Sequence, residues 1–128
     1  MSSDIQSTFI EAATADPDGI STAASVGNNA ALVIGGALAS GGSVTFDQPR
    51  NITILSAGDD SGISFTAVGT DETGAAATES ITGVDSDTAT GSQIFATIAS
   101  ITAVGNPAGN VSAGSGTSIL APMFQGRM

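Results

Sequence analysis

Carboxylates are the main side chains of this protein that could carry chemistry, because the usual catalytic groups are missing. The sequence has no His, Cys, Lys, Tyr or Trp, and its only cations are Arg50 and Arg127. General acid–base catalysis near neutral pH usually relies on His, or on a Lys, Tyr, Cys or carboxylate with an adjusted pKa. A Ser or Thr nucleophile needs a neighbouring base. A hydrolase with paired carboxylates is the one catalytic alternative, so the composition predicts a protein that is not an enzyme.

Three acidic clusters fall in segments that the sequence predicts to be turns. Oxygen-rich loops of this kind could hold Ca²⁺, which takes six to eight oxygen ligands. None of the clusters has the spacing of an EF-hand, and Asp is common in turns because its side chain caps nearby backbone N–H groups. We therefore expect turn chemistry and no cofactor, with a Ca²⁺ site as the alternative. The clusters are Asp59-Asp60, Asp71-Glu72 and Asp85-x-Asp87.

Arg50 follows Pro49 where the sequence predicts a strand to begin. Its guanidinium fork could pair with a turn carboxylate of the same or a neighbouring subunit. The alternative is a simple surface ion pair of little energetic value. We expect Arg50 to contact a neighbouring subunit.

The charge and hydropathy of the chain argue against several kinds of partner. A net charge of −10 without any Lys leaves no basic patch for the phosphates of nucleic acid, and it disfavours an anionic membrane surface. The sequence shows no apolar run of the length that a transmembrane helix needs and no secretory signal pattern. We expect a chain made in the cytoplasm that binds neither nucleic acid nor membrane.

The material for a hydrophobic core is sparse for a single domain of 128 residues. Leu, Ile, Val and Phe total 28 residues, whereas Ala alone supplies 21 and buries little area. No disulfide can compensate, because Cys is absent. Such a subunit is expected to gain stability from contacts with further copies, which stabilise the folded state by mass action.

Residues 30–128 are predicted to form an all-β domain, an antiparallel β-sandwich or a barrel-like fold. Residues of alternating polarity are separated by Gly- and Asp-rich turns at nearly regular spacing. The alternation is imperfect in 94–104, so either both faces of that strand are covered or a bulge shifts its register. The predicted strands span 30–34, 43–46, 51–55, 63–68, 77–82, 94–104 and 111–114.

The two ends of the chain carry apolar residues in weakly patterned sequence. Residues 1–29 are predicted to be an extended N-terminal arm with one short helix, which Asp16-Pro17-Asp18-Gly19 would end; a disordered tail is the alternative. Residues 118–128 fit a docking segment better than a free tail. The apolar residues that we expect to make contacts with neighbouring subunits are Ile5, Phe9, Ile10, Leu120, Met123 and Phe124.

The stretch 68–116 resembles a segment of tailed-bacteriophage virion proteins. It runs VGTDETGAAATESITG, TGSQIFATIASITAVG and NPAGNVSAGSG. The shared features are a GTD-x-x-G turn, a T-E-x-I-x-G strand, a G-x-x-x-F-x-T-I strand and an AG-x-V-x-x-G hairpin end. The resemblance implies a sandwich-like structural module and marks no catalytic or ligand-binding residue.

Small virion proteins of this kind are similar to capsid decoration (cement) proteins, which often form trimers on the shell exterior. We therefore expect a decoration protein that bridges copies of the major capsid protein, with a homotrimer favoured. Arg50 and the apolar residues of the two chain ends are expected to contact the capsid or another copy. One alternative is a head-fibre, tail or adaptor subunit of the virion. Another is a carbohydrate- or host-surface-binding module, which the scarcity of aromatic residues disfavours.

Overall fold

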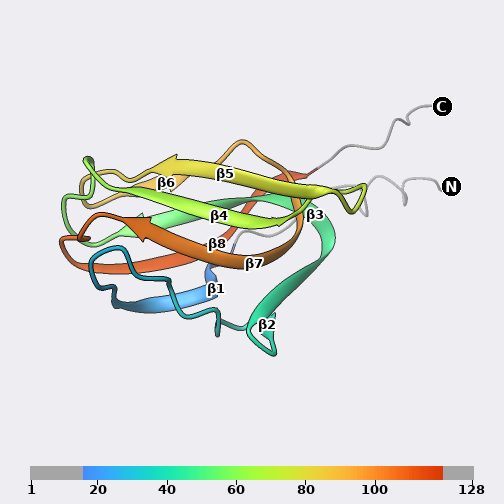
Figure 1. Cartoon of the computed structure of the whole chain (residues 1–128), viewed down its shortest axis with the longest axis horizontal. Helices are drawn as coiled ribbons and strands as arrows, with labels where there is room; N and C mark the ends of the chain where they lie inside the picture. The colour runs from blue at the N-terminus through green and yellow to red at the C-terminus, as the bar shows by residue number, and fades with distance from the viewer. Residues whose placement is uncertain (1–15, 120–128) are drawn as a thin grey trace, which may run out of the picture.

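The computed structural model describes residues 16–119, which form an all-β domain without helices (Figure 1). All strand pairs are antiparallel, as expected for a sandwich or barrel built from hairpins. The strands are β1 (Asp16–Ser25), β2 (Ala39–Ser40), β3 (Ser43–Ser56), β4 (Ser64–Thr70), β5 (Ala76–Thr82), β6 (Thr88–Thr90), β7 (Phe95–Val104) and β8 (Asn110–Ile119).

The strands belong to one 8-stranded sheet that folds over on itself into a nearly closed sandwich. Its order is β1-β8-β3-β7-β4-β5, and β2 and β6 both pair with β3. In Figure 1, β5, β4 and β7 run side by side as one layer. The other layer contains β6, the second half of β3, β8 and β1. This result confirms the all-β prediction.

Strand β3 belongs to both layers and replaces two strands that the sequence pattern predicts separately, 43–46 and 51–55. Its first part pairs with β7 and its second part with β8 and β6. The ladder to β7 is irregular between Thr45 and Arg50, an interval that contains Pro49, which has no N–H to donate. Proline thus interrupts the pairing without ending the strand.

A bulge resolves the imperfect alternation of β7. Val68 of β4 faces Ser100, whereas the next residue, Gly69, faces Ile98, so that Ala99 is the extra residue. The shift lets both Ile98 and Ile101 enter the core, where each is fully buried. Of the two explanations that the sequence left open, the bulge is therefore present.

The N-terminal boundary of the β domain differs from the prediction. The segment 16–25 is strand β1, which pairs with β8, so the sheet begins at Asp16 and not at residue 30. The register of β1 shifts twice, which explains why its sequence shows no clear alternation. Residues 1–15, with the predicted short helix, lie outside the described residues. The predicted strand 30–34 is reduced to one bridge between Ala31 and Thr102.

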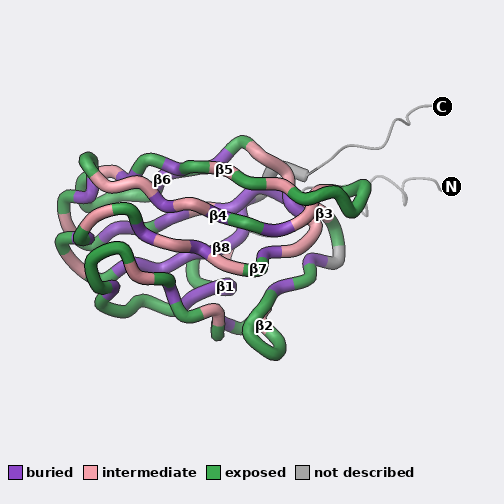
Figure 2. The backbone as a smooth tube through the Cα atoms, viewed as in Figure 1, coloured by how far each residue is buried: buried purple, intermediate pink, exposed green. Residues whose placement is uncertain are grey.

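The core lies between the two layers and is built mainly from β-branched residues and Phe (Figure 2). Phe65 and Phe95 are its largest fully buried side chains. Ala67, Ala89, Ala103 and Ala113 also belong to it, consistent with the Ala-rich composition. The fully buried Ile and Val residues are Ile20, Val44, Ile52, Ile54, Ile98, Ile101 and Val111.

Candidate interaction surface

The outer side of β5, β4 and β7 is a surface of hydroxyl and methyl groups without charge, which we call the hydroxyl face. Phe65 and Ala67 of β4 point into the core, so their neighbours along the strand point outward. The pairing places these outward residues in rows across the three strands. The rows are Thr82–Ser64–Val104, Ser80–Thr66–Thr102, Thr78–Val68–Ser100 and Ala76–Thr70–Thr97.

Contacts within the hydroxyl face are few and polar. The Thr70 and Thr97 hydroxyls lie 2.7 Å apart and share a hydrogen bond. Val68 and Val104 are its exposed large apolar residues, at 38% and 53% exposure. Such a face suits close packing against another uncharged surface, because no ion must be desolvated on contact.

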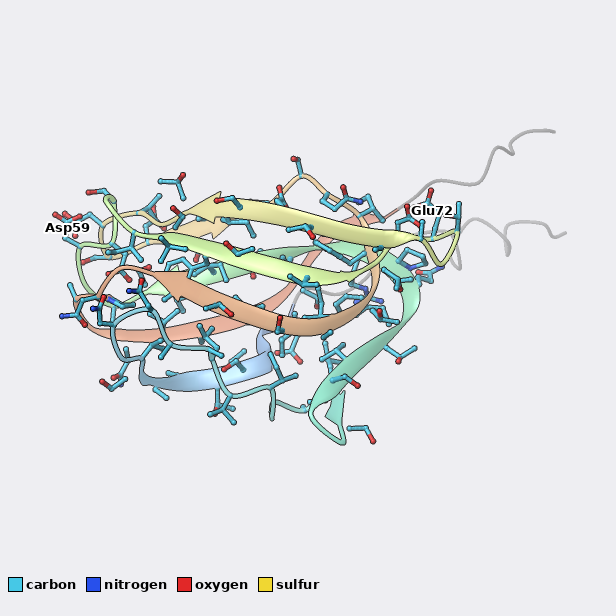
Figure 3. All side chains as sticks on the ribbon, in the orientation of Figure 1. Asp59 and Glu72 are labelled. Carbon is cyan, nitrogen blue, oxygen red and sulfur yellow. The ribbon has the colours of Figure 1, made fainter. Side chains whose placement is uncertain are left out.

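The acidic turns lie at the two ends of the domain, as the positions of Asp59 and Glu72 show (Figure 3). Asp71 Oδ1 accepts the Thr73 hydroxyl at 2.6 Å and the backbone N–H groups of Thr73 and Ala75 at 2.9 and 3.1 Å. Asp59 Oδ1 likewise accepts the hydroxyl and N–H of Ser61. These bonds confirm the predicted turn chemistry at both aspartates.

The same hydrogen bonds lower the pKa of both turn aspartates below the ordinary value. At Asp59 the Ser61 hydroxyl is the largest cause, and at Asp71 it is the Thr73 hydroxyl. Each bond stabilises the ionised carboxylate. Both carboxylates are therefore charged near neutral pH and keep the ends of the domain strongly acidic.

Within residues 16–119, no three acidic side chains come together in a way that could hold a metal ion. Both aspartates of the third predicted cluster also accept hydrogen bonds from the residue that follows them in the chain. Asp87 Oδ1 accepts the N–H of Thr88 at 2.8 Å, and Asp85 Oδ1 accepts the Ser86 hydroxyl at 3.0 Å. The geometry of this part of the chain therefore gives no support to the Ca²⁺ alternative.

Asp60 is a buried carboxylate, although the sequence analysis placed it in one predicted turn cluster with Asp59. It is fully buried, and its Oδ1 accepts the backbone N–H of Ala108 at 2.7 Å. Its own N–H donates to the Val84 carbonyl, and its carbonyl accepts from Ile63. Asp60 thus ties together three loops at one end of the sandwich. The neighbouring Asp59 is solvated, and the Asp59-Asp60 pair alone carries no signal that separates the two.

Arg50 is buried, with 8% of its surface exposed, at the point where β3 faces both β7 and β8. Its guanidinium carbon lies 5.5 Å from the centre of the Phe46 ring, and its Nε donates to the Gln48 carbonyl at 3.3 Å. This burial contradicts the alternative of an exposed surface pair. A direct contact with capsid or a second copy stays a prediction that this position does not favour.

The apolar residues expected to make contacts at the chain ends lie outside the described residues. The structure nevertheless shows which strands contain the first and the last described residues. Asp16, the first residue of β1, lies opposite Ser115 of β8, and β8 ends soon afterwards at Ile119. The first and last described residues, Asp16 and Ile119, therefore lie on neighbouring strands. The residues concerned are Ile5, Phe9, Ile10, Leu120, Met123 and Phe124.

The fold defines this part of the chain as an antiparallel β-sandwich domain with acidic ends and an uncharged outer face. Searches of protein-family models, curated proteins and solved structures returned no match. The described residues include no helix long and apolar enough to cross a membrane.

Proposed function

We propose that this protein is a non-enzymatic structural subunit of a phage virion, a decoration protein that binds the outside of the capsid and bridges neighbouring copies of the major capsid protein. The observation that carries the proposal is the exit of both chain ends from adjacent strands, next to Ser115 and Ile119. Two apolar end segments that start from one place can engage two neighbouring capsid subunits while the domain stays outside the shell.

The form of the domain supports a structural role. The four motifs of the phage resemblance correspond to the β4–β5 turn and to strands β5, β7 and β8. Several carboxylates of the described residues cap turns or join loops, as Asp71 and Asp60 do. Two Arg residues form no basic patch that could hold a polyanion, so the surfaces left to attract a partner are the hydroxyl face and the apolar chain ends.

A truncation tests the role of the N-terminal segment. Deleting residues 1–15 removes Ile5, Phe9 and Ile10 but leaves β1 intact, whereas a longer deletion would remove residues that pair with β8. We expect the truncated protein to keep its circular dichroism spectrum and to lose most of its binding to capsids of the encoding virus in co-sedimentation. Full binding by the truncated chain would contradict the proposed bridging by this segment.

Copy number separates a decoration protein from the other virion roles. Quantitative mass spectrometry of purified virions should find this chain at an abundance close to that of the major capsid protein. A handful to a dozen copies per particle would instead identify a tail or adaptor subunit and refute the decoration role.

A further inference from the structure

Strand β5 is an edge strand whose outer backbone groups are open. Its ladder partner is β4. At one end of this hairpin the Asp71 N–H donates to the Ala75 carbonyl, and at the other the Gly83 N–H donates to the Ile63 carbonyl. Hydrogen-bonded pairs alternate along an antiparallel ladder. Thr78 and Ser80 therefore point their N–H and C=O groups away from β4, where no strand of residues 16–119 pairs with them.

Strand β1, at the opposite end of the strand order, is covered in contrast to β5. Segment 35–38 bonds to its outer side: the Gly36 N–H donates to the Ile20 carbonyl and the Leu38 N–H to the Gly19 carbonyl. Pro17 and two register shifts further disturb this edge. Natural proteins blunt exposed edges in such ways to prevent pairing with other chains. The ladder between β5 and β4 has no register shift. The β1 edge is therefore blunted, whereas the β5 edge is regular.

We propose that β5 pairs antiparallel with β5 of a second copy about a twofold axis, joining the two hydroxyl faces into one continuous surface. Antiparallel pairing of two identical strands gives hydrogen-bond partners to the open backbone N–H and C=O groups of both copies at once. Because the same edge of both copies is used in a twofold contact, the assembly closes at two copies and does not grow into a fibre. The outward residues Thr78 and Ser80 bring no charge to the junction, and cross-strand Thr and Ser pairs are favourable.

Glu79 restricts the register of this pairing. Its carboxylate lies on the core side of β5 and accepts the backbone N–H groups of Ser92 and Gln93 at 2.8 and 3.3 Å. A twofold axis at Glu79 would place two carboxylates directly opposite each other, which is unfavourable. The axis therefore passes beside Thr78 or beside Ser80, so that one of these residues faces its own copy.

The contact is expected to be weak in dilute solution. A strand of seven residues offers an edge of about 24 Å, which buries less than the roughly 800 Å² per partner of a standard interface. Copies held close together on a common surface would pair more readily, because their effective concentration is raised. The inference does not depend on the proposed capsid role, and it predicts a dimer where the sequence analysis favoured a trimer.

Single-cysteine variants of the isolated full-length chain test the pairing, since the natural sequence has no Cys. Opposite residues of a hydrogen-bonded antiparallel pair have Cα atoms about 5.5 Å apart, within disulfide reach. Thr78→Cys or Ser80→Cys should give a covalent dimer under mild oxidation at least ten times faster than Thr66→Cys, which lies on the same face in the middle strand. Equal cross-linking at Thr66, or none at either edge residue, would overturn the proposal.

Sedimentation velocity over a range of concentrations gives an independent readout. The wild-type chain should show a concentration-dependent monomer–dimer equilibrium, and Thr78→Val, which keeps the backbone N–H, should preserve it. Thr78→Pro removes an N–H that points away from β4, a position where proline is tolerated, and should weaken the dimer at least tenfold. A wild-type monomer at all concentrations, a trimer, or an unchanged dimer in a folded Thr78→Pro variant would each refute β5 pairing. None of these results bears on the capsid truncation.

Discussion

Replacing Gly69 with Ala should destabilise the domain strongly, because β4 and β7 approach each other too closely there for a methyl group. A Cβ on Gly69 would overlap the Thr97 carbonyl oxygen and lie 2.8 Å from the Thr97 carbonyl carbon and 3.1 Å from the Ile98 Cα. All three atoms belong to the backbone, so no side-chain rotation relieves the overlap. This close approach occurs at the β7 bulge, where Gly69 faces Ile98.

The expected loss of stability in Gly69→Ala follows from the separation of β4 and β7 that a methyl group would require. Carbon atoms in contact are ordinarily about 3.5–4.0 Å apart, so the two strands must separate locally. Overpacking in a dense interior costs about 1–3 kcal/mol, and each backbone hydrogen bond lost with the separation costs about 1 kcal/mol more. We expect the free energy of unfolding to fall by about 3 kcal/mol, which lowers the Tm by roughly 10 °C for a domain of this size.

Thermal and urea unfolding followed by far-UV circular dichroism would measure this loss, since the chain has no Trp or Tyr for fluorescence. Gly62→Ala is the matched control, because a Cβ at Gly62 meets nothing within 4 Å. The control should leave stability unchanged or raise it by a few tenths of a kcal/mol, through a more restricted unfolded chain. If Gly69→Ala is as stable as Gly62→Ala, the described approach of β4 and β7 is wrong.

Two further predictions concern carboxylates. Glu79→Ala should lower the free energy of unfolding by about 1–2 kcal/mol in urea titrations, because the N–H groups of Ser92 and Gln93 lose their acceptor. Glu79→Gln keeps one amide oxygen and should lose less stability. Equal stability of Glu79→Ala and wild type would contradict a stabilising role of these hydrogen bonds. The pKa values of Asp59 and Asp71 are lower in the folded state than their ordinary value, so their stabilising effect is complete above the unfolded pKa, near pH 4, and declines as the pH falls through the folded values. Urea midpoints measured below pH 5 should therefore fall with pH, less steeply in Asp71→Asn than in wild type, and parallel curves would refute this assignment.

Much of the β architecture could be predicted from local sequence. Alternation in 63–68 and 77–82, with the acidic turn between them, predicts the β4–β5 hairpin that the structure contains. The turn roles of Asp59 and Asp71 follow equally from local chemistry, because the groups that they cap lie within a few residues of each aspartate. Such features depend on neighbours along the chain and so leave a local signal.

Features that depend on distant partners could not be predicted in this way. Strand β1 is stabilised by β8, with Asp16 opposite Ser115, and its own sequence shows mainly turn signals. Arg50 is buried where β3 faces Phe95 of β7 and Ile119 of β8. Asp60 is buried because the loop at Ala108 donates to it. In each case a segment far away in the sequence supplies the environment.

The sequence by itself determined the all-β class, the positions of several turns and the absence of the usual catalytic side chains, because composition and local periodicity are sufficient for these. Only the tertiary structure decided that β1 is covered while β5 is an open edge, and that Ser and Thr side chains form rows across β5, β4 and β7. The physical reason is that the register between distant strands is set by packing of the core, as in the facing of Phe65 and Ala103. That packing exists only once the whole sheet has formed.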